Sequence, residues 1–148
     1  VKNPEKHDSS FDNYVHPIFV NKNSKFYQII KAKETMVNSR HRRFVEKCPK
    51  LDKVGFCDDN YPDVIESKNK KFYIGVRFHP ESLYKKDDKM NNIFKEFISV
   101  IPYSFFSSFF NLSNTISSVA NSMSCLILLK NSHTKGLNQC IIVIRSKM

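Results

Sequence analysis

The apolar run at residues 72–78, F-Y-I-G-V-R-F, is the feature that most constrains the fold. A run that is apolar over most of its length is typical of a strand at the centre of a sheet, where both faces are covered. Residues 89–101 then place apolar side chains at i, i+3, i+4, i+7, i+8 and i+11, which is the spacing of one helix face. A buried strand followed by a covering helix predicts an α/β fold.

Shorter elements precede this strand. Ser24 is a candidate N-cap for a short helix that ends at Ile30. Further strand candidates are the β-rich runs bounded by turn residues at 14–20, 35–39, 54–57 and 64–67. The chain therefore divides into a polar segment at 1–13, an α/β region at 14–101 and an apolar, Ser- and Asn-rich extension at 102–148.

The extension is uncharged up to residue 129, but Ser and Asn dilute its apolar residues. A bilayer span needs about 20 mostly apolar residues, so we expect a poorly packed extension and no membrane contact. A membrane-tethered accessory protein, held through residues 103–129, stays open as an alternative. The first residues have no apolar signal segment, and we expect a cytoplasmic protein.

Charge and cysteine spacing exclude several classes of site. The net charge is +10, but the lysines are scattered among acids with no arginine-rich or aromatic-interleaved tract, so we expect no nucleic-acid partner. The four cysteines show no C-x-x-C spacing and no histidine at metal-site offsets. We therefore expect free thiols in a reducing compartment, no metal site and no cofactor.

His79 and Glu81 form the candidate catalytic pair, because they lie two residues apart where the strand at 72–78 ends. Side chains at i and i+2 of a strand point to the same face. The carboxylate can then accept the Nδ1–H of the imidazole, which fixes the tautomer and leaves Nε2 as a base. A thiol is the natural client of such a pair, since a neighbouring imidazole lowers a cysteine pKa.

The surrounding residues resemble a known family. Residues 75–81, G-V-R-F-H-P-E, resemble the G-V-Q-[FW]-H-P-E signature of class I glutamine amidotransferases. Residues 37–41, V-N-S-R-H, are similar to the V-N-S-x-H segment of the gamma-glutamyl hydrolase-like branch, which cleaves gamma-glutamyl amides. Residues 63–66, D-V-I-E, look like the turn and strand between these segments. The resemblance covers residues 14–101, the last third of such a domain.

The resemblance implies a fold, an activity and roles for individual residues. The fold would be the C-terminal portion of a three-layer, flavodoxin-like α/β domain with a mostly parallel sheet. His79 would be the general base of a Cys-His-Glu triad, and Glu81 would orient it. Ser39 and His41 would lie at the substrate site. Arg43, with its neighbour Arg42, departs from the family pattern and could hold a substrate carboxylate.

The sequence has no good match to the segment that carries the nucleophile of the triad. The family carries it on a G-x-C-x-G elbow, and the nearest match, at Cys57, lacks the second glycine and the helix that follows an elbow. Loss of the nucleophile alone costs on the order of 10⁶ in turnover, so we expect the chain to be inactive alone. It would be half of a split enzyme completed by a nucleophile-bearing partner chain, a decayed remnant, or a non-catalytic subunit that binds a small anionic ligand.

Overall fold

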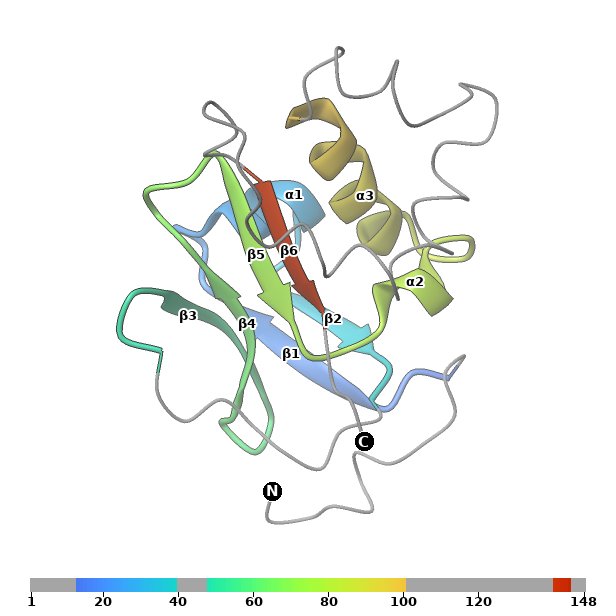
Figure 1. The fold of residues 1–148 in the computed structure, drawn as a ribbon. Coiled ribbons are helices and arrows are strands. Elements are labelled where there is room, and N and C mark those ends of the chain that lie inside the picture. The colour runs from blue at the N-terminus through green and yellow to red at the C-terminus, as the bar shows by residue number, and fades with distance from the viewer. Residues whose placement is uncertain (1–12, 40–47, 101–139, 145–148) are drawn as a thin grey trace.

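The structure is a computed structural model that describes residues 13–39, 48–100 and 140–144, the last of these by backbone alone. It is a mixed α/β fold in which a curled sheet carries helices on one face (Figure 1). The strands are β1 His16–Val20, β2 Glu34–Val37, β3 Asp52–Cys57, β4 Pro62–Glu66, β5 Phe72–Val76 and β6 Cys140–Ile144. All five strand candidates and both predicted helices are confirmed, with bounds that shift by a few residues.

The expectation of a mostly parallel sheet is wrong for the described residues. The strand order is β2-β1-β3-β4-β5-β6, and every pairing from β2 to β5 is antiparallel. The physical reason is the length of the connections at 58–61 and 67–71, because so few residues can reverse a strand but cannot carry a crossover back to the same end. The three-layer arrangement implied by the resemblance stays a prediction.

One parallel pairing extends the sheet beyond β5. β6 lies beside β5 in parallel, with Phe72 opposite Cys140 and Val76 opposite Ile144. Residues 140–144 were expected to belong to the extension, and this strand was not predicted. In consequence β5 is flanked by strands on both sides, as the apolar run at 72–78 predicts for a central strand.

The helices are α1 Lys25–Ile30, α2 Pro80–Leu83 and α3 Asp88–Val100. Ser24 is the N-cap of α1, as predicted, and its Oγ accepts a hydrogen bond from the backbone N–H of Tyr27 at 2.9 Å. The apolar face of α3 is buried as the helical spacing predicts, through Met90, Ile93, Phe94, Phe97 and Val100. α2 is a single turn that the sequence analysis did not predict.

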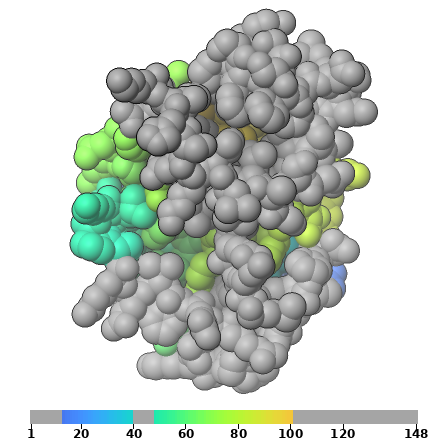
Figure 2. All heavy atoms as spheres, viewed as in Figure 1, coloured from blue at the N-terminus to red at the C-terminus, as the bar shows by residue number. Residues whose placement is uncertain are grey.

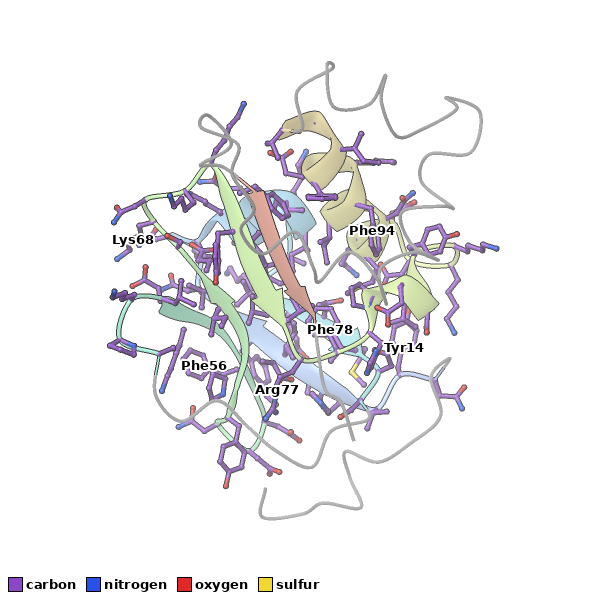
Figure 3. The ribbon with its side chains drawn as sticks, viewed as in Figure 1. Tyr14, Phe56, Lys68, Arg77, Phe78 and Phe94 are labelled. Carbon is purple, nitrogen blue, oxygen red and sulfur yellow. The ribbon has the colours of Figure 1, made fainter. Side chains whose placement is uncertain are left out.

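Aromatic contacts join the helices to the sheet. Phe72 of β5 packs against Phe97 of α3 with ring centroids 5.7 Å apart, and Phe26 of α1 lies 6.3 Å from Phe78. Figure 3 shows side chains between the sheet and the helices, with Phe78 among them. Burial of each such ring stabilises the fold by about 1.5–3 kcal/mol. This packing fixes the end of β5, from which the candidate catalytic residues follow.

A second contact ties α1 to the β4–β5 hairpin. Both oxygens of the buried Glu66 carboxylate accept hydrogen bonds from α1, one from the backbone N–H of Lys25 and one from that of Phe26, each at 3.0 Å. The Nζ of Lys25 in turn donates to the carbonyls of Ser67, Lys68 and Lys70. The hairpin turn and the first turn of α1 therefore hold each other in place.

Candidate functional site

His79 and Glu81 meet just beyond the end of β5. The Nδ1 of His79 lies 2.7 Å from Oε1 of Glu81, and the two side chains are 12% and 26% exposed. The predicted contact is confirmed, but its geometry is that of a helix start and not of a strand. His79 is the N-cap of α2, Pro80 is its first residue and Glu81 lies in its first turn. This turn brings the carboxylate back to the ring.

The hydrogen bond assigns the proton on the ring. An ionised carboxylate can only accept, so Nδ1 of His79 carries the proton that it donates to Glu81. Nε2 lies on the opposite side of the ring and is the basic nitrogen of the neutral tautomer. Oε2 of Glu81 is buried with no hydrogen-bond partner among the described residues.

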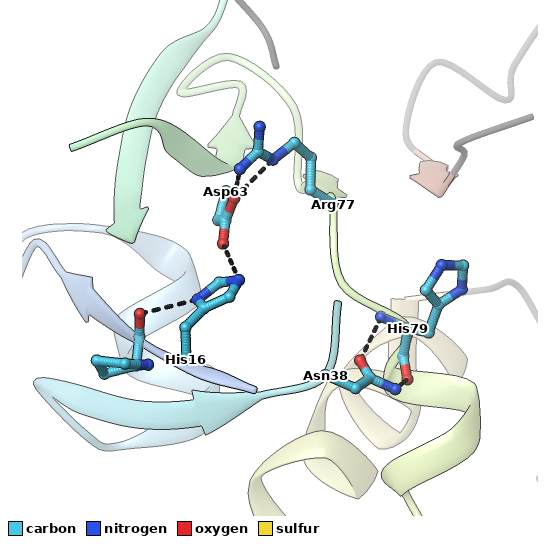
Figure 4. A network of polar contacts seen from close by, with 6 residues as sticks. His16, Asn38, Asp63, Arg77 and His79 are labelled. Atoms are coloured by element: carbon cyan, nitrogen blue, oxygen red, sulfur yellow. Dashed lines mark hydrogen bonds and ion pairs between the residues drawn. The ribbon is translucent and has the colours of Figure 1, made fainter. Parts of the chain in front are cut away.

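Asn38 holds the backbone of His79 from the end of β2. Its Oδ1 accepts the backbone N–H of His79 at 2.7 Å, and its Nδ2 donates to the carbonyl of His79 at 2.9 Å (Figure 4). Asn38 is fully buried. Asn38 lies within the V-N-S-R-H segment, but it was not predicted as a site residue. The signal that could have found it is an amide side chain directly after a strand, because an amide can pair with a peptide as another strand does.

The three predicted substrate contacts are placed only in part. Ser39 comes two residues after the end of β2 and is fully buried. His41 and Arg43, with Arg42, lie outside the described residues. The substrate-binding role of all three stays a prediction.

A buried charged network lies two residues upstream of His79. Oδ1 of Asp63 is 2.6 Å from Nε and 2.5 Å from an Nη of Arg77, and Oδ2 of Asp63 is 3.6 Å from Nε2 of His16. Asp63 lies between the other two (Figure 4) and, like His16, has a side chain with no exposed area. The backbone N–H of Arg77 also donates to the carbonyl of Asp63 at 2.9 Å. The arginine that replaces the signature glutamine is therefore paired with an acid.

The surroundings of Cys57 do not suit a catalytic nucleophile. It is 2% exposed at the end of β3, and burial, together with the nearby charge of Asp63, raises the pKa of its thiol. A thiol held neutral in this way is inert, which agrees with the sequence-based exclusion. Cys48 is half-buried and directs its thiol to the carbonyl of Leu51 at 3.6 Å. Cys125 lies outside the described residues.

The described ranges hold no group of three or more His, Cys, Asp or Glu side chains that is placed to bind a metal ion. No helix in this part of the chain combines the length and the apolar character that crossing a membrane needs. In the space-filling view, teal atoms from the region around the start of β3 are visible at the surface (Figure 2).

A comparison with known protein families places part of the chain in one of them. The sequence model of the family described as Peptidase C26 matches residues 1–81, a stretch that contains Asn38, Asp63, His79 and Glu81. No curated protein matches the chain.

Proposed function

The chain belongs to the peptidase C26 family, and from this premise we propose that it carries the base half of a cysteine hydrolase site for gamma-glutamyl amides. The observation that supports the proposal is the 2.7 Å hydrogen bond between Nδ1 of His79 and Glu81, with the ring at the end of a buried strand. This arrangement matches the orienting half of a nucleophile–base–acid triad.

The proposed reaction runs through a thioester. His79 accepts the thiol proton at Nε2, and the thiolate attacks the carbonyl carbon of the gamma-glutamyl amide. The tetrahedral intermediate collapses as His79 gives its proton to the leaving amine. Water, deprotonated by His79, then attacks the thioester, and glutamate and the thiol are released. Glu81 holds the ring in the required tautomer and stabilises the imidazolium in each step.

The thiol is proposed to come from outside these 148 residues. They contain no G-x-C-x-G sequence, and the nearest match, Cys57, is buried with a raised thiol pKa. We therefore propose that a partner chain, or a longer form of this chain, brings the nucleophile and its oxyanion-binding N–H groups to His79.

The test is a reconstitution assay with gamma-glutamyl-p-nitroanilide and with glutamine. The 148-residue chain alone is expected to show no turnover. Addition of the polypeptide encoded directly upstream is expected to give turnover, and His79→Gln is expected to lower it by 10²–10⁴-fold. The matched control Lys68→Gln changes an exposed residue and leaves turnover intact.

Two results would overturn the proposal. One is turnover by the chain alone that survives His79→Gln. The other is the lack of any G-x-C-x-G elbow in the adjoining coding sequence together with the lack of turnover in the mixture.

A non-catalytic binding subunit is the second candidate, and the burial of Cys57 favours it, because the described residues then offer no reactive thiol at the site. It predicts saturable binding of gamma-glutamyl amides by the isolated chain, measured by titration calorimetry, with no turnover in any mixture. Turnover in the reconstituted mixture excludes it.

A further inference from the structure

Asn38 makes an unusual pair of hydrogen bonds. Its side-chain amide contacts both the N–H and the carbonyl of one residue, His79, at 2.7 and 2.9 Å. The two residues are 41 positions apart in the chain, and Asn38 has no exposed area. A buried amide side chain gives up solvation, and these two hydrogen bonds offset that cost.

The backbone of His79 lies between two elements, and its carbonyl also accepts the backbone N–H of Ser82 at 3.2 Å. It follows β5 and precedes α2, and as the N-cap of α2 it makes no side-chain capping bond. Its φ of −112° and ψ of 80° belong to neither the helix nor the strand. Asn38, at the end of β2, therefore supplies the amide contacts that a neighbouring strand would otherwise make.

The orientation of the imidazole depends on this peptide. The direction of the Cα–Cβ bond is set by the backbone, and the ring must reach Oε1 of Glu81 at 2.7 Å from that origin. A shift of the backbone of His79 moves the ring away from a carboxylate that is held separately by α2. An interaction of this kind acts on the ring without touching it.

We propose that Asn38 is a positioning residue for His79: its side-chain amide holds the peptide of His79 so that Nδ1–H points at Glu81. The catalytic consequence of this assignment rests on the proposed function. The structural part does not, because it concerns the hydrogen bond between the ring and Glu81.

The test follows the ring proton of His79 by NMR of histidine labelled with ¹⁵N, with the resonance assigned by its loss in His79→Gln. The unmodified chain is expected to show a slowly exchanging, downfield Nδ1–H signal. Asn38→Ala is expected to broaden it or to speed its exchange by about tenfold or more. Asn38→Asp keeps the shape and one acceptor but places an oxygen against the carbonyl of His79, and the same loss is expected.

Two controls separate positioning from general loss of structure. Glu81→Gln is expected to alter the same signal, because it changes the acceptor itself. Asn91→Ala removes an amide from α3 whose Oδ1 has no hydrogen-bond partner among the described residues, and the signal is expected to persist. Should the Asn38 variants fail to fold, hydrogen exchange in the unmodified chain decides, because the backbone amide of His79 and the side-chain amide of Asn38 must both be protected.

An unchanged ring signal in both folded Asn38 variants, or fast exchange of both amides in the unmodified chain, overturns the assignment. In the reconstituted assay Asn38→Ala is expected to lower kcat on the order of 10²-fold with little change in KM. A ring signal that is lost with Asn38 in a chain that no mixture activates would refute the proposed function and leave the positioning role standing.

Discussion

At the scale of single residues, the carboxylate of Asp63 balances the charge of Arg77 in the buried network. Its carboxylate has no exposed area and contacts Arg77 at 2.5 and 2.6 Å. Removal of one member of a buried pair leaves the other charged and uncompensated, whereas replacement of both by neutral groups removes the cost of burying charge. The two kinds of change should therefore have very different effects on stability.

We expect Arg77→Gln and Asp63→Asn each to lower the free energy of unfolding by about 3–5 kcal/mol, and the double variant to recover most of the loss. Urea unfolding of the four proteins measures the coupling. The control is Lys68→Gln, which breaks an exposed ion pair with Asp52 at 3.5 Å and should cost less than about 1 kcal/mol. Additive losses in the double variant would contradict the network.

Cys57 gives a prediction about reactivity and pH. Burial raises the pKa of its thiol in the folded chain. As the pH rises past the ordinary thiol pKa, the unfolded state therefore loses the thiol proton before the folded state does. This contribution to stability is fully present below the ordinary thiol pKa of 9.0 and is lost as the pH rises above it. We expect iodoacetamide to label Cys57 at least tenfold more slowly than the half-buried Cys48 at pH 8, measured by peptide mapping.

The difference should vanish in guanidinium chloride, where both thiols are exposed. Equal labelling rates in the folded chain would show that the thiol of Cys57 is accessible, and its exclusion as a nucleophile would then lose its physical basis.

The contact between His79 and Glu81 could be predicted from sequence because the two residues are close along the chain. The place of Asn38 directly after a strand marks it as a candidate, but its partner could not be predicted, since the contact depends on where β2 ends relative to β5. The same holds for Asp63 and Arg77, each of which reads as an ordinary polar residue until the hairpin brings them together.

Elements were predictable where their signals are local. Ser24 marks the start of α1, and the apolar spacing marks α3. α2 was missed because four residues are too few to show a helical period, although Pro80 at its first position is a helix-start signal. Strand direction was wrong because it was taken from the resemblance, while the short turns at 58–61 and 67–71 already favour antiparallel pairing.

The hydrogen bonds that Glu66 accepts from the first turn of α1 give a prediction at the scale of elements. Glu66→Ala leaves the N–H groups of Lys25 and Phe26 without their acceptor, and we expect a loss of about 1–2 kcal/mol in the free energy of unfolding. Chemical denaturation followed by circular dichroism measures it. Glu34→Ala, at an exposed position of β2, is the matched control and should stay within about 0.5 kcal/mol of the unmodified chain.

A similar small loss in both variants would mean that the helix start is stabilised by Ser24 alone. A further loss in Glu66→Ala/Ser24→Ala beyond the sum of the single changes would show that the two caps act on one unit.

β6 determines which strands of the whole molecule lie at the edges of the sheet. Among the residues that the structure describes, β2 and β6 are the edge strands, and β5 has a neighbour on both sides. An unpaired edge offers its N–H and carbonyl groups to other chains. The stability and the solubility of the molecule should therefore both depend on residues 140–144.

Deletion of residues 140–148 is expected to lower Tm by several degrees and to increase light scattering on heating, because β5 becomes an edge strand. Deletion of 145–148 alone leaves β6 intact and should change neither quantity. Equal behaviour of the two truncated chains would show that β5 does not need this partner.

The parallel pairing of β5 with β6 also has a consequence for the order of folding. β1 to β5 all lie within residues 16–76, whereas β6 at Cys140–Ile144 is separated from β5 by a far longer stretch of chain. Contacts between residues distant in sequence form slowly, because a long loop must be closed before they contribute any stability. On a ribosome, the antiparallel strands can therefore assemble before residues 140–144 are synthesised, and the edge of β5 stays open to other nascent chains until β6 is available to pair with it.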